Sequence, residues 1–121
     1  MPARIGNISF DCEDALKLGG FWAEVLGRTL DPESGAGFAS IGGGDAERRQ
    51  LALYFEKVPE SKVAKNRVHL DLVDPDASAV SRLVSLGASI IDEHQLGNHR
   101  WTVMHDPEGN EFCVAAASIT G

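Results

Sequence analysis

The groups best suited to chemistry in this sequence lie in two short stretches, HLD at residues 69–71 and EFC at residues 111–113. Side chains two apart in a strand point to the same side. If both stretches are strands, one presents an imidazole and a carboxylate, and the other a carboxylate and a thiol. Such groups bind zinc and iron, and they also act as acids, bases and nucleophiles. The elements around them decide whether they meet a metal, a ligand or solvent.

Residues 100–114 are predicted to form a β-hairpin around DPEGN, residues 106–110, a cluster of turn-forming residues. A five-residue loop there fixes which residues face one another across the two strands. Three pairs then share one face: His105 with Glu111, Val103 with Cys113, and Trp101 with Ala115. The other face carries Met104, Phe112 and Val114, an apolar set expected to lie against a helix.

Polar and aromatic residues are predicted on the open faces of several strands. Alternation in residues 4–12 and 67–73, together with the hairpin, places there Asn7, Ser9, Asp11, His69, Asp71, Trp101, His105, Glu111 and Cys113. A polar residue on an open sheet face is most often simply solvated. The number of such residues favours a binding surface instead. Cys113 is expected to line this surface and not to act as a nucleophile, because the sequence offers no source of a lowered pKa.

Two helices are predicted. The first begins near Glu13 or Asp14 and stops at Gly27, and the second runs from about residue 75 to residue 86, with Asp74 as its cap and Gly87 as its stop. The pair Gly19-Gly20 inside the first helix costs roughly 2 kcal/mol of helix propensity relative to alanine. Tertiary packing must therefore hold that turn.

Further strands are predicted at residues 37–41, 51–56, 89–92, 100–105 and 111–115, with a short one at residues 29–31. If Leu51, Leu53 and Phe55 face the core, Tyr54 lies on the open face between Ala52 and Glu56. Tyr54 would then offer a flat aromatic wall to a ligand, as Trp101 would on the hairpin.

The chain is approximately repeated at an interval of sixty residues. Phe10-Asp11 aligns with Leu70-Asp71, Asp14 with Asp74, and Leu26-Gly27 with Leu86-Gly87. The pattern predicts an α+β fold of two βαβββ modules, about residues 1–60 and 61–121, in a single domain. The polar strand faces of both modules are free to form a shared concave surface.

Composition excludes several classes of function. A formal net charge of −7 would repel nucleic acid, and the apolar runs are far shorter than the ~20 residues that span a bilayer. The start of the sequence has no secretory-signal layout, so a cytoplasmic protein is expected. Cys12 and Cys113 are interpreted as free thiols, and Arg48 and Arg49 as part of a solvated loop.

Three motifs at this spacing carry a family resemblance: LGGFWAEVLG (residues 18–27), NRVHLDL (66–72) and VMHDPEGNEFCV (103–114). Together they resemble the glyoxalase-like group of the glyoxalase, bleomycin-resistance and extradiol-dioxygenase superfamily, also called the vicinal oxygen chelate superfamily. The resemblance spans nearly the whole chain. It implies two paired modules whose strands curl as a mixed sheet around a cleft, with helices on the outer face, usually in a homodimer.

In the metal enzymes of that superfamily, the first and last strands of both modules supply one ligand each. His69 falls on the third ligand position. The first falls on Asn7 by spacing from the helix or on Ser9 by the repeat, and neither binds divalent metals well. Glu56 is the carboxylate nearest the second position, and Cys113 stands where the final glutamate is expected. The resemblance therefore implies the cleft but not the standard four-ligand metal site.

The sequence predicts a cofactor-free protein that binds a hydrophobic or aromatic small molecule. Its expected ligand-binding residues are Asn7, Tyr54, His69, Asp71, Trp101, Val103, His105, Glu111 and Cys113. The alternative is a metal-dependent lyase, isomerase or dioxygenase with a rearranged zinc, iron, manganese or nickel site centred on His69 and Glu111, such as His69, His105 and Glu111. Glyoxalase I activity is not expected, since it needs the metal and a base among its ligands. A structural domain with a vestigial cleft is the third hypothesis.

Overall fold

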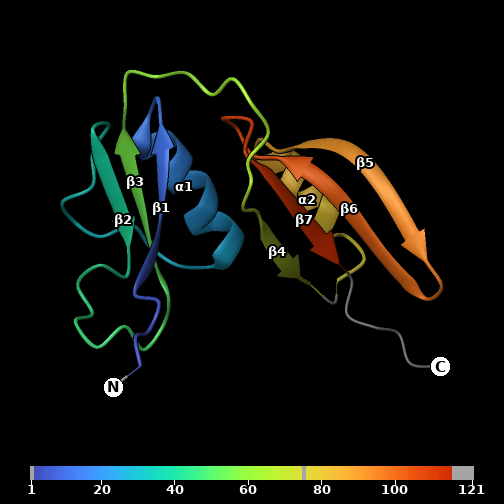
Figure 1. The fold of residues 1–121 in the computed structure, drawn as a ribbon, viewed down its shortest axis with the longest axis horizontal. Coiled ribbons are helices and arrows are strands. Elements are labelled where there is room, and N and C mark those ends of the chain that lie inside the picture. The colour runs from blue at the N-terminus through green and yellow to red at the C-terminus, as the bar shows by residue number, and fades with distance from the viewer. Residues whose placement is uncertain (1, 75, 116–121) are drawn as a thin grey trace. The chain divides into compact units, whose positions relative to one another are not determined.

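The computed structural model describes residues 2–74 and 76–115, and it divides into two compact units, Met1–Lys62 and Val63–Gly121. The first unit contains β1 (Asn7–Cys12), α1 (Ala15–Leu26), β2 (Phe38–Ile41) and β3 (Ala52–Lys57). The second contains β4 (Leu70–Val73), α2 (Ala79–Leu86), β5 (Ser89–Leu96), β6 (His99–His105) and β7 (Glu111–Ala115). Figure 1 shows that each unit has its own sheet and helix, which confirms the α+β fold and its two modules.

The first sheet has the order β1-β3-β2, with β3 parallel to β1 and antiparallel to β2. One face carries Phe10 and Phe55, whose ring centroids are 5.3 Å apart, and Phe10 lies 5.7 Å from Trp22 of α1. Trp22 and Phe55 are completely buried. Burying large aromatic side chains stabilises a domain by a few kcal/mol each, so this contact between helix and sheet is the core of the first unit.

Helix α1 begins and ends as predicted. The Asp14 carboxylate accepts a hydrogen bond from the backbone N–H of Lys17, and Gly27 ends the helix in the left-handed conformation, with φ of 62°. Gly19 faces the sheet, and a Cβ at that position would lie 3.1 Å from Cδ2 of Phe55. The missing side chain lets α1 approach the sheet closely, which explains why a glycine is tolerated in mid-helix.

The open face of the first sheet is as expected around Tyr54. Ser9 and Ser40 pair with Tyr54 across the sheet, so all three side chains share one face. Leu53 and Phe55 are buried on the other face. Leu51, which precedes β3, is exposed instead of joining them.

The prediction of a strand at residues 29–31 is wrong, although one backbone hydrogen bond of the strand type is present. The Asp31 N–H donates to the Ser40 carbonyl at 2.8 Å, beside β2. The Ser34 N–H then donates to the Asp31 carbonyl at 3.1 Å, so the chain turns away before a ladder can form.

The second sheet has the order β4-β7-β6-β5, with β4 parallel to β7 and the other pairs antiparallel. Strand β5 extends to Leu96, four residues beyond its predicted end, because Gly97 adopts φ of 61° and returns the chain into β6. Met104 and Phe112 are buried on the apolar face. Within the described residues, neither α1 nor α2 is long and apolar enough to cross a membrane.

Helix α2 begins later than predicted, at Ala79 instead of about residue 75. The Asp74 carboxylate accepts from the Asp76 N–H, and the Asp76 carboxylate accepts from the N–H and hydroxyl of Ser78, each at 2.9 Å. These side-chain bonds satisfy backbone groups in a turn and so compete with the first helical turn. The predicted end at Gly87 is confirmed. Residue 75, the predicted start of this helix, lies outside the described residues.

The predicted register of the hairpin is confirmed. His105 pairs with Glu111, and the neighbouring pairs are Val103 with Cys113 and Trp101 with Ala115. Asp106, only 3% exposed, fixes the turn: its carboxylate accepts from the N–H of Glu108 and from the N–H and side-chain amide of Asn110, at 2.9 to 3.0 Å. Local chemistry of the turn therefore sets which residues β6 and β7 present on the open face.

Candidate functional site

The open face of the second sheet is centred on Cys113 of β7. The parallel pairing places Asp71 of β4 beside Cys113 on one side, and the antiparallel pairing places Val103 of β6 on the other. All three were predicted ligand-binding residues. Cys113 is half-buried and carries a free thiol.

A group of three potential metal ligands forms around this thiol. His69 lies directly before β4, and its Nδ1 is 3.2 Å from Oδ1 of Asp71. One ligand atom from each of His69, Asp71 and Cys113 lies within 4.8 Å of the others. The His69 and Asp71 side chains are 42% and 68% exposed. The group offers nitrogen, oxygen and sulfur donors together at the surface of one sheet.

A second polar pair lies at the end of the hairpin. Nε2 of His105 is 3.7 Å from Oε1 of Glu111, while Oε2 of Glu111 accepts a hydrogen bond from the Asn66 N–H at 3.0 Å. Glu111 thereby ties the segment before β4 to β7. The predicted metal set joined His69 to this pair. In the described part of the chain, the three groups that come within 4.8 Å are instead those of His69, Asp71 and Cys113.

Trp101 is not a bare aromatic wall. Its ring stacks on that of His94, with centroids 5.3 Å apart and planes at 18°. Nε2 of His94 in turn lies 3.2 Å from Oδ2 of Asp92. The sequence prediction missed His94 because it ended β5 at Asp92, and the polar run of residues 92–95 carries no alternation that marks a strand.

The environment of Cys113 keeps its thiol protonated. Burial raises the pKa of Cys113 above its ordinary value of 9.0, and the negative charge and hydrogen bonding of Asp71 raise it further, whereas Lys65 lowers it. A thiolate, not a thiol, is the nucleophile. The pKa therefore supports the prediction that Cys113 lines the surface and does not attack a substrate by itself.

The first unit carries a pocket of about 510 Å³ on the open face of its own sheet. It is lined by Asp31, Pro32, Glu33, Ser34, Phe38, Ser40, Gly43, Gly44 and Tyr54. Phe38 and Tyr54 meet edge to face, with centroids 5.5 Å apart and planes at 74°. Tyr54 is thus the predicted site residue that lines this pocket. Asn7 lies elsewhere on the same face, where its side-chain amide donates to the Ser9 hydroxyl at 3.0 Å.

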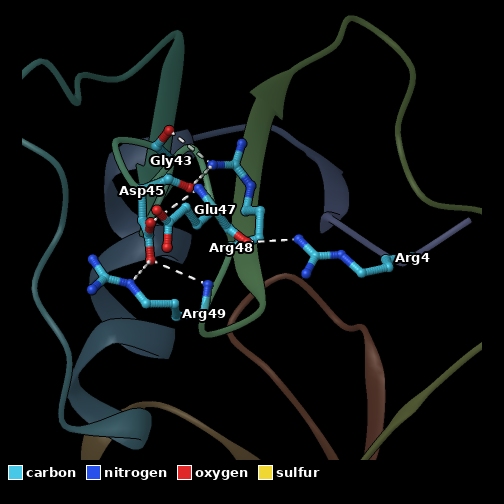
Figure 2. Close-up of polar contacts among 6 residues, drawn as sticks. All are labelled: Arg4, Gly43, Asp45, Glu47, Arg48 and Arg49. Atoms are coloured by element: carbon cyan, nitrogen blue, oxygen red, sulfur yellow. Dashed lines mark hydrogen bonds and ion pairs between the residues drawn. The ribbon is translucent and has the colours of Figure 1, made fainter.

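A loop held by Arg48 supplies Gly43 and Gly44 to the lining of this pocket, and Figure 2 shows how Arg48 contacts that loop. The Arg48 guanidinium donates to the carbonyls of Gly43 and Asp45 and, at 2.7 Å, to the hydroxyl of Tyr54. Its backbone adopts φ of 52°, a left-handed conformation that is unusual for a side chain of this size. Arg48 is therefore a structural part of the loop, which corrects the interpretation of Arg48 and Arg49 as merely solvated. Arg49, 78% exposed, does fit that interpretation.

Asp45 organises the same loop, and its contacts appear in Figure 2. Its carboxylate accepts from the N–H of Glu47 at 3.1 Å and from the N–H and Nε of Arg49 at 3.2 Å. Desolvation alone would raise the pKa of Asp45, but these hydrogen bonds and the charge of Arg49 lower it below 3.8. A second anchor comes from Arg4, which donates to the Glu47 carbonyl at 2.6 Å.

Comparison with known proteins identifies the family. A family model described as a glyoxalase-like domain matches residues 7–115. The chain belongs to the glyoxalase-like domain family. This family is part of the vicinal oxygen chelate superfamily, in agreement with the resemblance seen in the sequence motifs. No curated protein shows a significant match.

Solved structures share the glyoxalase-like fold at low identity. One is a glyoxalase/bleomycin resistance protein/dioxygenase family enzyme from Burkholderia phytofirmans PsJN, with a TM-score of 0.71 and 18% identity over 94% of this chain and 98% of that one. Another is a mutant fosfomycin resistance protein FosX from Listeria monocytogenes complexed with Mn(II) and 1S,2S-dihydroxypropylphosphonic acid, with a TM-score of 0.73 and 15% identity over 98% and 94%. A third is a lactoylglutathione lyase from Agrobacterium tumefaciens, with a TM-score of 0.59 and 15% identity over 99% and 98%. These similarities establish the fold.

Proposed function

We propose that this glyoxalase-like protein binds a small hydrophobic or aromatic molecule. The observation that carries the proposal is the pocket of about 510 Å³ in the first unit, walled by the rings of Phe38 and Tyr54. Small-molecule sites are typically concave, within about 300–1,000 Å³, and lined by aromatic groups with a few fixed polar atoms. Here the carboxylate of Asp31, held by the Ser40 hydroxyl and the Gly43 N–H, is a polar group of that kind.

Binding of a neutral aromatic dye, N-phenyl-1-naphthylamine, tests this proposal. Its fluorescence should rise on adding the protein, and Tyr54→Ala or Phe38→Ala should weaken its affinity about tenfold, because each removes an aromatic wall. Ile5→Ala is the control, since Ile5 is 77% exposed and does not line the pocket. Equal binding by the parent protein and both pocket variants would contradict the proposal.

A metal-dependent activity is the second candidate, and the group of His69, Asp71 and Cys113 favours it. Imidazole, carboxylate and thiolate donors suit zinc, and three protein ligands with an open fourth position are the usual layout of a catalytic zinc. These three residues would hold the ion, which when bound supplies Lewis-acid polarisation of a substrate oxygen. The protonated thiol of Cys113 fits less well, because it must lose its proton to bind a metal.

Metal content after purification without chelators tests the second candidate, followed by titration with Zn(II), Fe(II), Mn(II) and Ni(II). Stoichiometric metal that is lost in His69→Ala and Cys113→Ser but kept in His94→Ala would establish the site and remove the metal-free form of the first proposal. His94 is the matched control, because it lies in the same sheet outside the group of three. Equal weak uptake by all variants would exclude a metal at this position.

The proposal includes a homodimer. The second unit leaves several large apolar side chains exposed, namely Val63, Val68, Val73, Val84, Ile90, Ile91 and Leu96. Pairing with a second copy of the chain would remove such surface from water. Light scattering coupled to size-exclusion chromatography should give twice the mass of the 12.9 kDa chain. A Val73→Asp/Ile90→Asp double variant should then elute as a monomer.

A further inference from the structure

The side chains that line the pocket of the first unit carry a net negative charge. Two carboxylates, Asp31 and Glu33, line it, whereas its lining contains no lysine or arginine. The guanidinium of Arg48 contacts two of the lining residues, and it donates to the carbonyls of Gly43 and Asp45 and to the hydroxyl of Tyr54. An anionic ligand would therefore meet two like charges in the lining, while the guanidinium that borders the pocket is already engaged by the loop carbonyls and Tyr54.

Asp31 is fixed in place for a ligand. Its Oδ2 accepts from the Ser40 hydroxyl at 2.6 Å and from the Gly43 N–H at 2.8 Å. Backbone bonds from Asp31 to Ser40 and from Ser34 to Asp31 hold its main chain as well. Both side-chain bonds use Oδ2, so Oδ1 remains available on a carboxylate whose position is already set. Such preorganisation reduces the entropy lost on binding.

The aromatic walls add a second attraction for positive charge. Phe38 and Tyr54 stand edge to face at 5.5 Å, so their rings present differently oriented π faces within one pocket. A cation within about 6 Å of a ring centroid is attracted by the ring quadrupole, most strongly when it is partly desolvated. Arg48 already uses this property of Tyr54, with its guanidinium carbon 5.8 Å from the ring centroid.

We infer that this pocket selects a ligand with an ammonium group attached to an apolar or aromatic body. The ammonium lies against Asp31 and the aromatic rings, and the apolar body fills the remaining volume. This inference rests on the proposed small-molecule binding and adds the charge of the ligand. Because Glu33 is exposed, its contribution is expected to be smaller than that of Asp31.

Three probes of similar shape and different charge test the inference: phenyltrimethylammonium, neutral tert-butylbenzene and anionic benzenesulfonate. Binding is followed by the amide signals of Gly43 and Gly44 in ¹⁵N-labelled protein. The cation should bind about fivefold to tenfold more tightly than the neutral probe, and the anion more weakly than either. Raising the salt concentration should weaken binding of the cation but not of the neutral probe.

Charge variants identify the source of the preference. Asp31→Asn keeps an oxygen to accept from Ser40 and Gly43, so the pocket should persist while the preference for the cation falls about fivefold. Glu33→Gln should reduce the preference less. Glu60→Gln removes the same charge at an exposed residue outside the pocket lining and should change nothing.

The outcomes separate this inference from the proposal beneath it. If the neutral probe binds as tightly as the cation, or Asp31→Asn keeps the full preference, the inference is overturned while small-molecule binding stands. If none of the three probes, nor the neutral dye, perturbs Gly43 and Gly44, both fail. Selective, salt-sensitive binding of the cation that is reduced in Asp31→Asn supports both.

Discussion

The two units are alike in the order of their elements, although the described part of the first has one strand fewer, and they differ in the chemistry they carry. The first buries a tryptophan and a phenylalanine between a twelve-residue helix and its sheet, and it carries the pocket. The second has an eight-residue helix, a wholly exposed strand β5, and the group of potential metal ligands. The two units therefore resemble each other as scaffolds but carry different surface groups.

Strand pairing shows which residues correspond in the two copies. Asp11 pairs with Glu56 in the first parallel pair, and Asp71 pairs with Cys113 in the second. Cys113 therefore corresponds to Glu56. The second unit has a thiol where the first has a carboxylate, so a repeated fold does not require a repeated site.

The largest expected difference between the units lies in their helices. Trp22 and Arg82 occupy the same place in the repeat, but Trp22 is completely buried and Arg82 is exposed. Trp22→Ala should lower the free energy of unfolding by about 3–5 kcal/mol, and Arg82→Ala should change it by about 0.5 kcal/mol or less. Chemical denaturation followed by circular dichroism measures both. Similar losses of unfolding free energy in the two variants would contradict the claim that α1 is packed more tightly than α2.

The two aspartate-centred turns should respond differently as well. The carboxylates of Asp106 and Asp45 each accept the three hydrogen bonds described above, but Asp106 is buried and Asp45 is more exposed. Asp106→Ala should lower the free energy of unfolding by about 2–3 kcal/mol, because it removes a buried acceptor and leaves partly buried donors of Glu108 and Asn110 unpaired. Asp45→Ala should cost less, since water replaces the lost acceptor. Urea denaturation measures both losses of unfolding free energy. A larger loss in Asp45→Ala than in Asp106→Ala would contradict this prediction.

Adjacent glycines of α1 give a sharper test of close packing. Gly20→Ala should stabilise the protein by about 1 kcal/mol, because a Cβ at that position meets nothing within 4 Å and alanine favours the helix. Gly19→Ala should instead destabilise it by about 1–3 kcal/mol, since the added Cβ presses against Leu30 and Phe55. Thermal unfolding of the pair under identical conditions measures the difference. Stabilisation by both substitutions would show that α1 packs less closely.

The smallest expected effect concerns Cys113 in chelator-treated protein. Because the pKa of Cys113 is raised above 9.0, its alkylation by iodoacetamide at pH 7 should be slower than that of an unstructured cysteine, with a pH midpoint above 9.0. The folded pKa exceeds the unfolded one, so the stability that this thiol contributes is present below pH 9 and is lost as the pH rises through the folded pKa. Asp71→Asn should lower the midpoint. A midpoint below 9.0 in the parent protein would contradict the assignment of its environment.

Local signals predicted the parts of the fold that local chemistry determines. The hairpin register followed from DPEGN because Asp106 bonds within its own turn, and α1 followed from Asp14 and Gly27. The start of α2 could not be predicted, because Asp74 and Asp76 are as good at closing turns as at capping a helix. The spacing of apolar residues does not show whether such side chains will close a turn or cap a helix.

The candidate sites divide in the same way. Strand parity placed His69, Asp71 and Cys113 on one open face. The pocket was missed except for Tyr54, because most of its other walls come from the irregular residues 31–34 and 43–44 on either side of β2, whose path depends on contacts with that strand. Alternation locates side chains on strands, whereas a loop that folds over a strand leaves no periodic pattern in the sequence.

The left-handed backbone of Arg48 has a consequence for how this protein could diversify. One residue joins the loop to the hydroxyl of Tyr54, and it does so in a conformation that glycine would adopt more easily. Glycine at this position would relax the backbone but release the loop from the aromatic ring. A single codon thus decides whether this loop is tied to Tyr54, a residue of the pocket lining, while the buried side of the sheet, with Leu53 and Phe55, stays unchanged.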